Sequence, residues 1–149
     1  MNSNSRTSIL LSRICILLFA VCLLGCDIFG VPLVRIFAEY RGLDKTSLIA
    51  LTVCLYALSV PAWVLLGSLW KLLGNLNRSE VFTQDNIALL KVIVFCCAAA
   101  VILCIAGCFF YLPLIIIAIA AAFMMLIVQI VKNVFRQALD MKSELDLTI

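Results

Sequence analysis

One stretch without any charged residue constrains the fold more than any other feature of the chain. It runs from Val92 to Val131. As a single α-helix it would be roughly 60 Å long at 1.5 Å per residue, about twice the thickness of a bilayer's hydrocarbon core. The stretch therefore has to turn back on itself. Pro113, in the segment FFYLPLI, suits that turn because proline cannot continue a helix but fits the first turn of a new one. The sequence predicts a tight hairpin of two membrane-spanning helices, about 88-110 and 113-133.

The rest of the composition also indicates a membrane protein. Of the 149 residues, 66% are hydrophobic and 13% are charged, which lies outside the usage of soluble globular domains. Two further apolar blocks, about 12-34 and 47-70, are long enough to cross a bilayer. We expect one all-α membrane domain over 1-149, a four-transmembrane-helix bundle. A connection at 71-87 and a tail at 134-149 would lie outside the lipid.

Positively charged residues are unequally divided between the two sides of the predicted bundle. Eight Lys and Arg lie in the N-terminal segment, the 71 to 91 connection and the tail, whereas the first connection holds three, Arg35, Arg41 and Lys45. The positive-inside rule places the richer side in the cytoplasm. We therefore expect cytoplasmic N- and C-termini in a multi-pass protein of the bacterial cytoplasmic (inner) membrane.

The segment VCLLGCDIFG leaves an alternative to the first span. Arg6 and Arg13, the apolar stretch after them and LLGC have the order of a lipoprotein signal, with Cys26 as the acylated residue. Leu24 is bulky for such a cleavage site, and the residues after Asp27 are apolar where a lipid-anchored chain has a polar tether. We favour an uncleaved first helix; lipidation of Cys26 would leave three helices.

Asp27 is the one acidic residue inside a predicted span, and such residues are functional-site candidates by default. It precedes Arg35 by roughly 12 Å along a helix, which predicts a position in the outer third of the span. Three environments stay open for its carboxylate: lipid headgroups, an arginine such as Arg35 or Arg41, or another subunit.

The eight cysteines all fall in apolar spans, and six of them form two trios with the same spacing of seven and then four residues. The trios are Cys15, Cys22 and Cys26, and Cys97, Cys104 and Cys108. Each trio forms one stripe on a helix. Histidine is absent and no CxxC occurs, so we interpret the cysteines as small packing residues and expect no metal and no cofactor.

The connection before the third span carries the signals of a helix start. Gly74 is expected to end the second helix, and Thr83 to cap the third. Phe82 and Ile87 occupy the positions of a hydrophobic staple, and Asp85 places a negative charge in the first turn.

The tail changes its hydrophobic period. One helical face holds Phe135, Ala138, Leu139 and Lys142, whereas Leu145, Leu147 and Ile149 alternate with polar residues. This predicts a helix followed by an extended, partly apolar end.

Two stretches carry a resemblance to a family. NRSEVFTQDNIALLKVI and the terminal FRQALDMKSELDLTI resemble small bacterial membrane proteins with four predicted helices, known only as a domain of unknown function. The most specific parts are Val81 to Leu90 and the final LDLTI. Members are often encoded beside a small helix-turn-helix regulator, which implies a membrane component of a regulatory or stress-response pair. The cysteine-rich spans do not belong to the family pattern, and the resemblance assigns no catalytic residue.

Two functions follow from these observations. The first is a non-enzymatic membrane protein whose loop and tail contact a partner, such as a cytoplasmic helix-turn-helix regulator, without binding nucleic acid itself. The candidate contacts are Arg78, Glu80, Phe82, Thr83, Asp85, Asn86, Glu144, Leu145, Asp146, Leu147 and Ile149. The alternative is a small ion-coupled or multidrug-type transporter that uses Asp27. It would work as a homo-oligomer, because four helices of this length are too few to enclose a pore.

Overall fold

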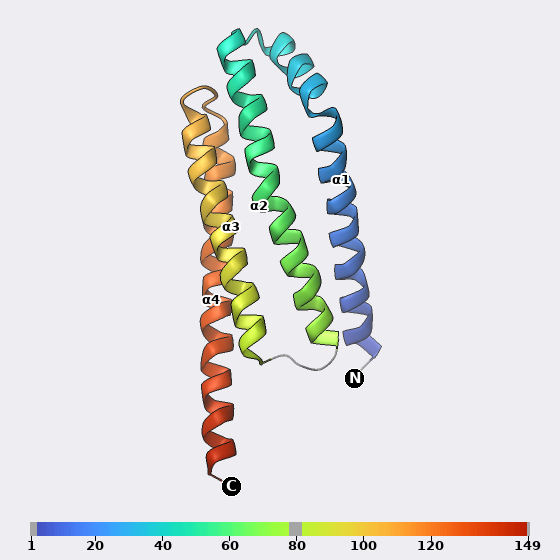
Figure 1. The fold of residues 1–149 in the computed structure, drawn as a ribbon, viewed down its shortest axis with the longest axis vertical. Coiled ribbons are helices and arrows are strands. Elements are labelled where there is room, and N and C mark those ends of the chain that lie inside the picture. The colour runs from blue at the N-terminus through green and yellow to red at the C-terminus, as the bar shows by residue number, and fades with distance from the viewer. Residues whose placement is uncertain (1–2, 78–81, 149) are drawn as a thin grey trace.

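The computed structural model describes residues 3–77 and 82–148, which form four α-helices. They are α1 (Ser3–Arg41), α2 (Lys45–Asn77), α3 (Gln84–Cys108) and α4 (Leu114–Leu147). All four are long and apolar enough to cross a membrane. The starts of α1 and α3 and the ends of α2 and α4 share one end of the bundle, which we call the terminal end (Figure 1). The opposite end, with two short turns at 42–44 and 109–113, is the turn end.

Close backbone contacts join only consecutive helices among the described residues: α1 with α2, α2 with α3, and α3 with α4. The predicted α3–α4 hairpin is therefore confirmed, and α1 is an outer helix supported mainly by α2. At the turn end, the Phe37 ring of α1 also meets Tyr111 edge-on, with centroids 5.6 Å apart. In Figure 1, α1 bends toward α2 in its last third, after Pro32. Proline explains the bend because it removes a backbone donor from the helix.

The first connection is shorter than the gap between the first two predicted spans. Gly42 has a φ of 64°, and the N–H groups of Gly42 and Leu43 donate to the carbonyls of Glu39 and Ala38. This is a Schellman motif, which glycine permits because it adopts positive φ without steric cost. The helices thus extend beyond the predicted spans, whose limits in the bilayer stay predictions.

The turn between α3 and α4 depends on close packing at Gly107. Its carbonyl accepts hydrogen bonds from the backbone N–H groups of Phe110 and Tyr111. A Cβ atom on Gly107 would lie 2.6 Å from Leu114 Cδ1 and 3.2 Å from Cys54 Sγ. A side chain at this position would require the end of the Leu114 side chain to shift. Pro113 directly precedes α4, as its helix-starting property predicts.

Two predicted helix ends are wrong. α2 continues three residues past Gly74 to Asn77. A glycine ends a helix where it adopts positive φ, and Gly74 does not. The tail is helical through Leu147, not extended after Lys142. Extending a helix already formed needs no new nucleation, and the Thr148 hydroxyl adds a bond to the Glu144 carbonyl at 2.6 Å.

The two cysteine trios have different environments. On α3, Cys97 and Cys104 are buried, which agrees with the packing interpretation. On α1, Cys15 and Cys22 are exposed on the outside of the bundle, so that interpretation is wrong for them. The same spacing produces a stripe on both helices, but α1 has only α2 to pack against and turns most of its surface outward.

Candidate functional site

Asp27 is held by three side chains of α2. The Ser59 hydroxyl donates to Asp27 Oδ1 at 2.6 Å, and the Trp63 indole Nε1 donates to Oδ2 at 2.8 Å. The Tyr56 hydroxyl donates to the Asp27 backbone carbonyl at 3.0 Å. These three donors follow one face of α2, because their positions differ by three and four residues. Each carboxylate oxygen therefore has a donor from the neighbouring helix.

The environment of Asp27 differs from the three that the sequence left open, since its carboxylate partners come from α2. Its position along the bundle follows from Ser59, which lies near the midpoint between Lys45 and Lys71, roughly 20 Å from each along α2. A carboxylate hydrogen-bonded to Ser59 is thus near the middle of the segment between these two lysines. Its depth in a bilayer, which the spacing to Arg35 placed in the outer third of the first span, stays a prediction.

The Asp27 cluster has a clear structural effect. α1 is an outer helix with few buried side chains, among them Ile16 and Ala38. Hydrogen bonds between helices are one of the forces that associate spans within lipid, where the hydrophobic effect between helices is absent. Asp27 supplies both acceptors for such bonds and fixes the register of α1 on α2.

A second polar region lies at the terminal end, where α1, α2 and α3 surround a pocket of about 720 Å³. Its charged lining residues are Arg13, Lys71 and Asp85. The Arg13 guanidinium lies over the Trp70 ring, 5.6 Å from its centroid. Arg13 Nε is buried and has no hydrogen-bond partner in the described part of the chain.

Beside this pocket, an amide pair joins α2 to α3. The Asn75 side chain donates to Asn86 Oδ1 at 2.7 Å, and Asn86 is 0% exposed. The Thr83 hydroxyl accepts from the Asn86 backbone N–H at 3.4 Å, so the predicted N-cap is confirmed. Thr83 and Asn86 therefore shape the start of α3.

The remaining predicted contact residues divide into four groups. Phe82 is partly exposed and packs against Phe135 of α4, with ring centroids 5.4 Å apart. Asp85 lines the pocket. Four residues lie exposed on the last turns of α4: Glu144, Leu145, Asp146 and Leu147. Three more lie outside the described residues: Arg78, Glu80 and Ile149.

Sequence reasoning did not identify the partners of Asp27 or the pocket. The spacing of Tyr56, Ser59 and Trp63 marks a polar face on α2, but not which helix it meets. Arg13 and Lys71 look like ordinary charges at span ends. Within residues 3–77 and 82–148, no three His, Cys, Asp or Glu side chains gather as a metal site would require.

The comparisons identify a family. Residues 9–149 match the family described as "Protein of unknown function (DUF2975)". The chain belongs to this family, and the resemblance noted from its loop and tail is confirmed. No curated protein and no solved structure matches the chain.

Proposed function

We propose that this member of the DUF2975 family is a non-enzymatic protein of the bacterial inner membrane that presents the end of α4 to a cytoplasmic partner. The observation that carries the proposal is the length of α4. Phe135 meets Phe82 beside the start of α3, and the helix continues to Leu147 for about 18 Å more. Figure 1 shows this end projecting beyond the other three helices. Every described residue from Asp140 onward is exposed.

The projecting helix carries an apolar stripe suited to another helix. Val134, Ala138, Met141 and Leu145 are spaced four, three and four residues apart, the spacing of a coiled-coil seam. Val134, Met141 and Leu145 are 54%, 60% and 67% exposed. The stripe lies beside Phe135, whose ring meets Phe82 next to the start of α3. An amphipathic helix of a partner would cover it through anchors at the same spacing.

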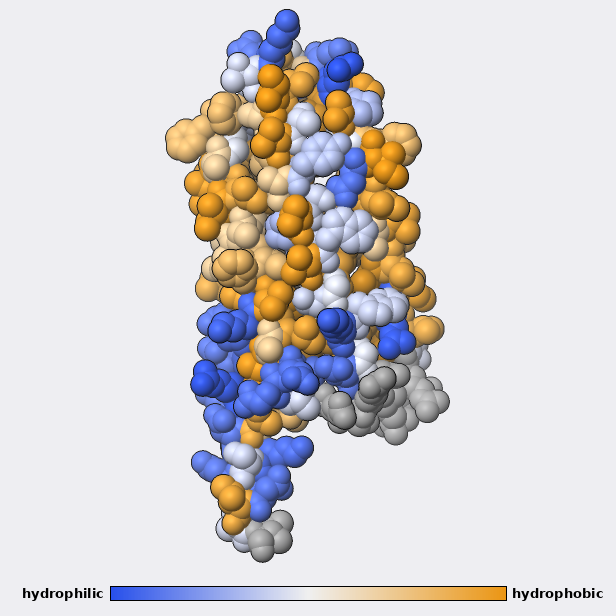
Figure 2. Space-filling model, viewed as in Figure 1, coloured by the Kyte–Doolittle hydropathy of each residue, from blue (hydrophilic) through white to orange (hydrophobic). Residues whose placement is uncertain are grey.

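The charge of this helix indicates a basic partner. Between Asp140 and Asp146 the helix carries three carboxylates and one lysine. Figure 2 shows hydrophilic side chains gathered over this projecting part, below a mostly hydrophobic body. Proteins that bind DNA are basic over part of their surface. A small helix-turn-helix regulator, the partner class implied by the family resemblance, has both the helices and the charge that this surface requires.

Co-purification of the full chain with the neighbouring regulator tests the proposal. The regulator should be retained by the wild-type protein in mild detergent and lost, by about tenfold or more, with Met141→Asp. A buried charge in a helix–helix seam is disfavoured by several kcal/mol. Leu147→Asp is the matched control: it adds the same charge one and a half turns away and off the stripe, and should leave retention within about twofold.

Two outcomes contradict the proposal. One is a regulator that never co-purifies with the wild-type chain. The other is equal retention by Met141→Asp and the wild-type protein. Circular dichroism of each variant separates loss of docking from loss of the helix.

A second candidate function, ion-coupled transport by a homo-oligomer, is supported by the position of Asp27. A carboxylate near the middle of a span is where proton- and cation-coupled transporters hold such groups. Proteoliposomes with the purified chain and a pH-sensitive dye test this function. Flux that is present in the wild-type protein and lost in Asp27→Asn supports it. Flux that is absent, or equal in the two proteins, rules it out.

A further inference from the structure

The pocket at the terminal end has one more positive than negative charge in its lining. Arg13 comes from α1, Lys71 from α2 and Asp85 from α3. None of the three has a salt bridge within the described residues. A ligand with a single negative charge would balance the set.

Arg13 is prepared for such a ligand. Its guanidinium lies over the Trp70 ring, 5.6 Å from the ring centroid, and the buried Nε leaves one donor without a partner in the described chain. A buried donor without an acceptor is costly. Phosphate oxygens match the fork of guanidinium donors better than any neutral acceptor. The neighbouring Asn75 amide donates one hydrogen to Asn86, and Arg13 and Lys71 are the cationic donors among the described lining residues.

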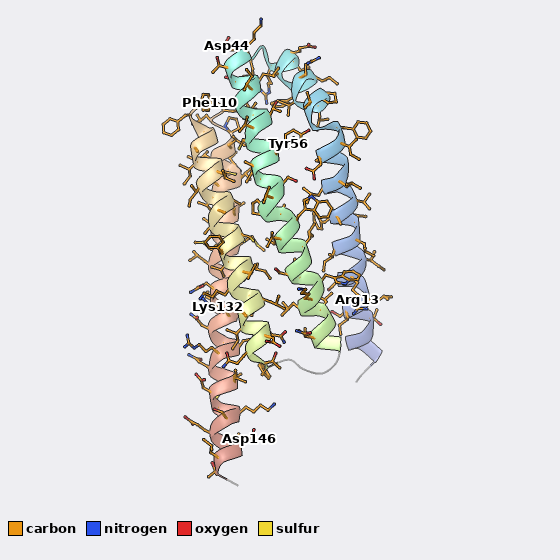
Figure 3. All side chains as sticks on the ribbon, in the orientation of Figure 1. Arg13, Asp44, Tyr56, Phe110, Lys132 and Asp146 are labelled. Atoms are coloured by element: carbon orange, nitrogen blue, oxygen red, sulfur yellow. The ribbon has the colours of Figure 1, made fainter. Side chains whose placement is uncertain are left out.

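The depth of the pocket points to a lipid as the source of the phosphate. Arg13 and Lys71 are the charges at which the apolar spans of α1 and α2 begin and end, and tryptophan beside them is typical of a membrane interface. Figure 3 shows Arg13 at about the same height along the bundle as Lys132, the charge that closes the apolar part of α4. The α3 wall of the pocket adds apolar side chains, Ala88, Leu89 and Val92.

We propose that this pocket binds the phosphodiester of an anionic phospholipid. The phosphate accepts hydrogen bonds from Arg13 and Lys71, and an acyl chain leaves along Val92 into the bilayer. Basic pockets between membrane helices on the cytoplasmic side are known to take such headgroups. Binding here is independent of a partner on α4.

Native mass spectrometry of the full chain tests the site. The protein, purified in a neutral detergent, is given equal amounts of phosphatidylglycerol and phosphatidylcholine with identical acyl chains. The wild-type chain should carry several-fold more phosphatidylglycerol. Arg13→Gln and Lys71→Gln should each reduce that excess by about tenfold, the effect of losing one charge-assisted hydrogen bond. Lys91→Gln is the matched control, since Lys91 is an exposed cation at the start of α3 that does not line the pocket.

A gain-of-binding variant protects the test against misfolding. Asp85→Asn removes the carboxylate that faces the anion and should raise the phosphatidylglycerol excess by about threefold or more. Equal binding of the two lipids by the wild-type chain overturns the proposal, as does an equal loss in Arg13→Gln, Lys71→Gln and Lys91→Gln, which would indicate unspecific attraction. Displacement of the lipid by millimolar inorganic phosphate would overturn the lipid assignment and make free phosphate the ligand.

Discussion

Asp27 and Arg13 are both charged residues of α1, but only one of them finds its hydrogen-bond partners within the described chain. Both oxygens of the Asp27 carboxylate accept bonds from α2, whereas Arg13 keeps a buried Nε without an acceptor. The satisfied group acts as a joint between helices. The unsatisfied group, at the terminal end beside Trp70, lines the pocket for which we propose a ligand. Asp27 thus joins two helices, whereas Arg13 is the residue on which the proposed lipid site depends.

Removal of the Asp27 carboxylate is expected to have the largest effect on stability. Asp27→Leu leaves the Ser59 hydroxyl and the Trp63 indole without their acceptor, so α1 loses its main polar attachment to α2. The midpoint of thermal unfolding in detergent, followed by circular dichroism, should fall by several degrees. Asp146→Leu, on the projecting end of α4, is the control and should leave the midpoint nearly unchanged. An unchanged midpoint in Asp27→Leu would show that Asp27 does not attach α1 to α2 and would contradict the contrast between Asp27 and Arg13.

The two donors should have smaller and coupled effects. Ser59→Ala and Trp63→Phe each remove one hydrogen bond while keeping most of the packing, and each should cost about 0.5–1.5 kcal/mol. The loss in free energy of unfolding caused by Trp63→Phe should differ between the wild-type and the Ser59→Ala protein, because the two donors share one carboxylate. Equal costs in both backgrounds would show that the two donors act independently of each other.

Close packing beside Asp27 should have a still smaller effect. A Cβ atom on Gly30 would lie 2.7 Å from Leu55 Cδ2 and 3.2 Å from the Tyr56 hydroxyl, while Gly25 has open space. Gly25→Ala should stabilise by up to about 1 kcal/mol through helix propensity. Gly30→Ala should lose most or all of that gain to overpacking. Chemical unfolding of the two variants measures the difference, and equal stabilisation would mean that α1 and α2 separate freely at this point.

Arg13→Gln, measured without added lipid, should have the smallest effect. It loses the contact with Trp70, worth about 0.5–1 kcal/mol, but no bond from Nε to the described chain. Excess phosphatidylglycerol should stabilise the wild-type chain, because a ligand that binds only the folded state stabilises that state. The Arg13→Gln variant should gain far less stability. A large loss of stability without lipid would instead show that Arg13 is a structural residue like Asp27.

Sequence reasoning succeeded where a feature depends on neighbours along the chain. The Thr83 cap and the turn at Pro113 follow from local backbone chemistry, and both are present. It failed where two local signals competed. In the last turns of α4, the alternation of three apolar residues predicted an extended end, but the existing helix continues to Leu147. A further miss is Gly42. A glycine followed by an apolar residue such as Leu43 is the pattern of a Schellman helix end, but sequence reasoning did not place the end of the first helix there.

The sequence alone determined that the chain is a four-helix membrane protein, because uncharged segments of that length have one stable solution in a bilayer. Only the tertiary structure decided what its polar residues do. Two identical cysteine spacings gave a buried stripe on α3 and a largely exposed one on α1, because an outer helix packs against only one neighbour. In the same way, Asp27 joins two helices because Ser59 and Trp63 face it, whereas none of the described residues around Arg13 supplies an acceptor for its Nε. Partners of this kind are set by the rotation of each helix about its axis, which hydropathy and charge along one chain do not specify.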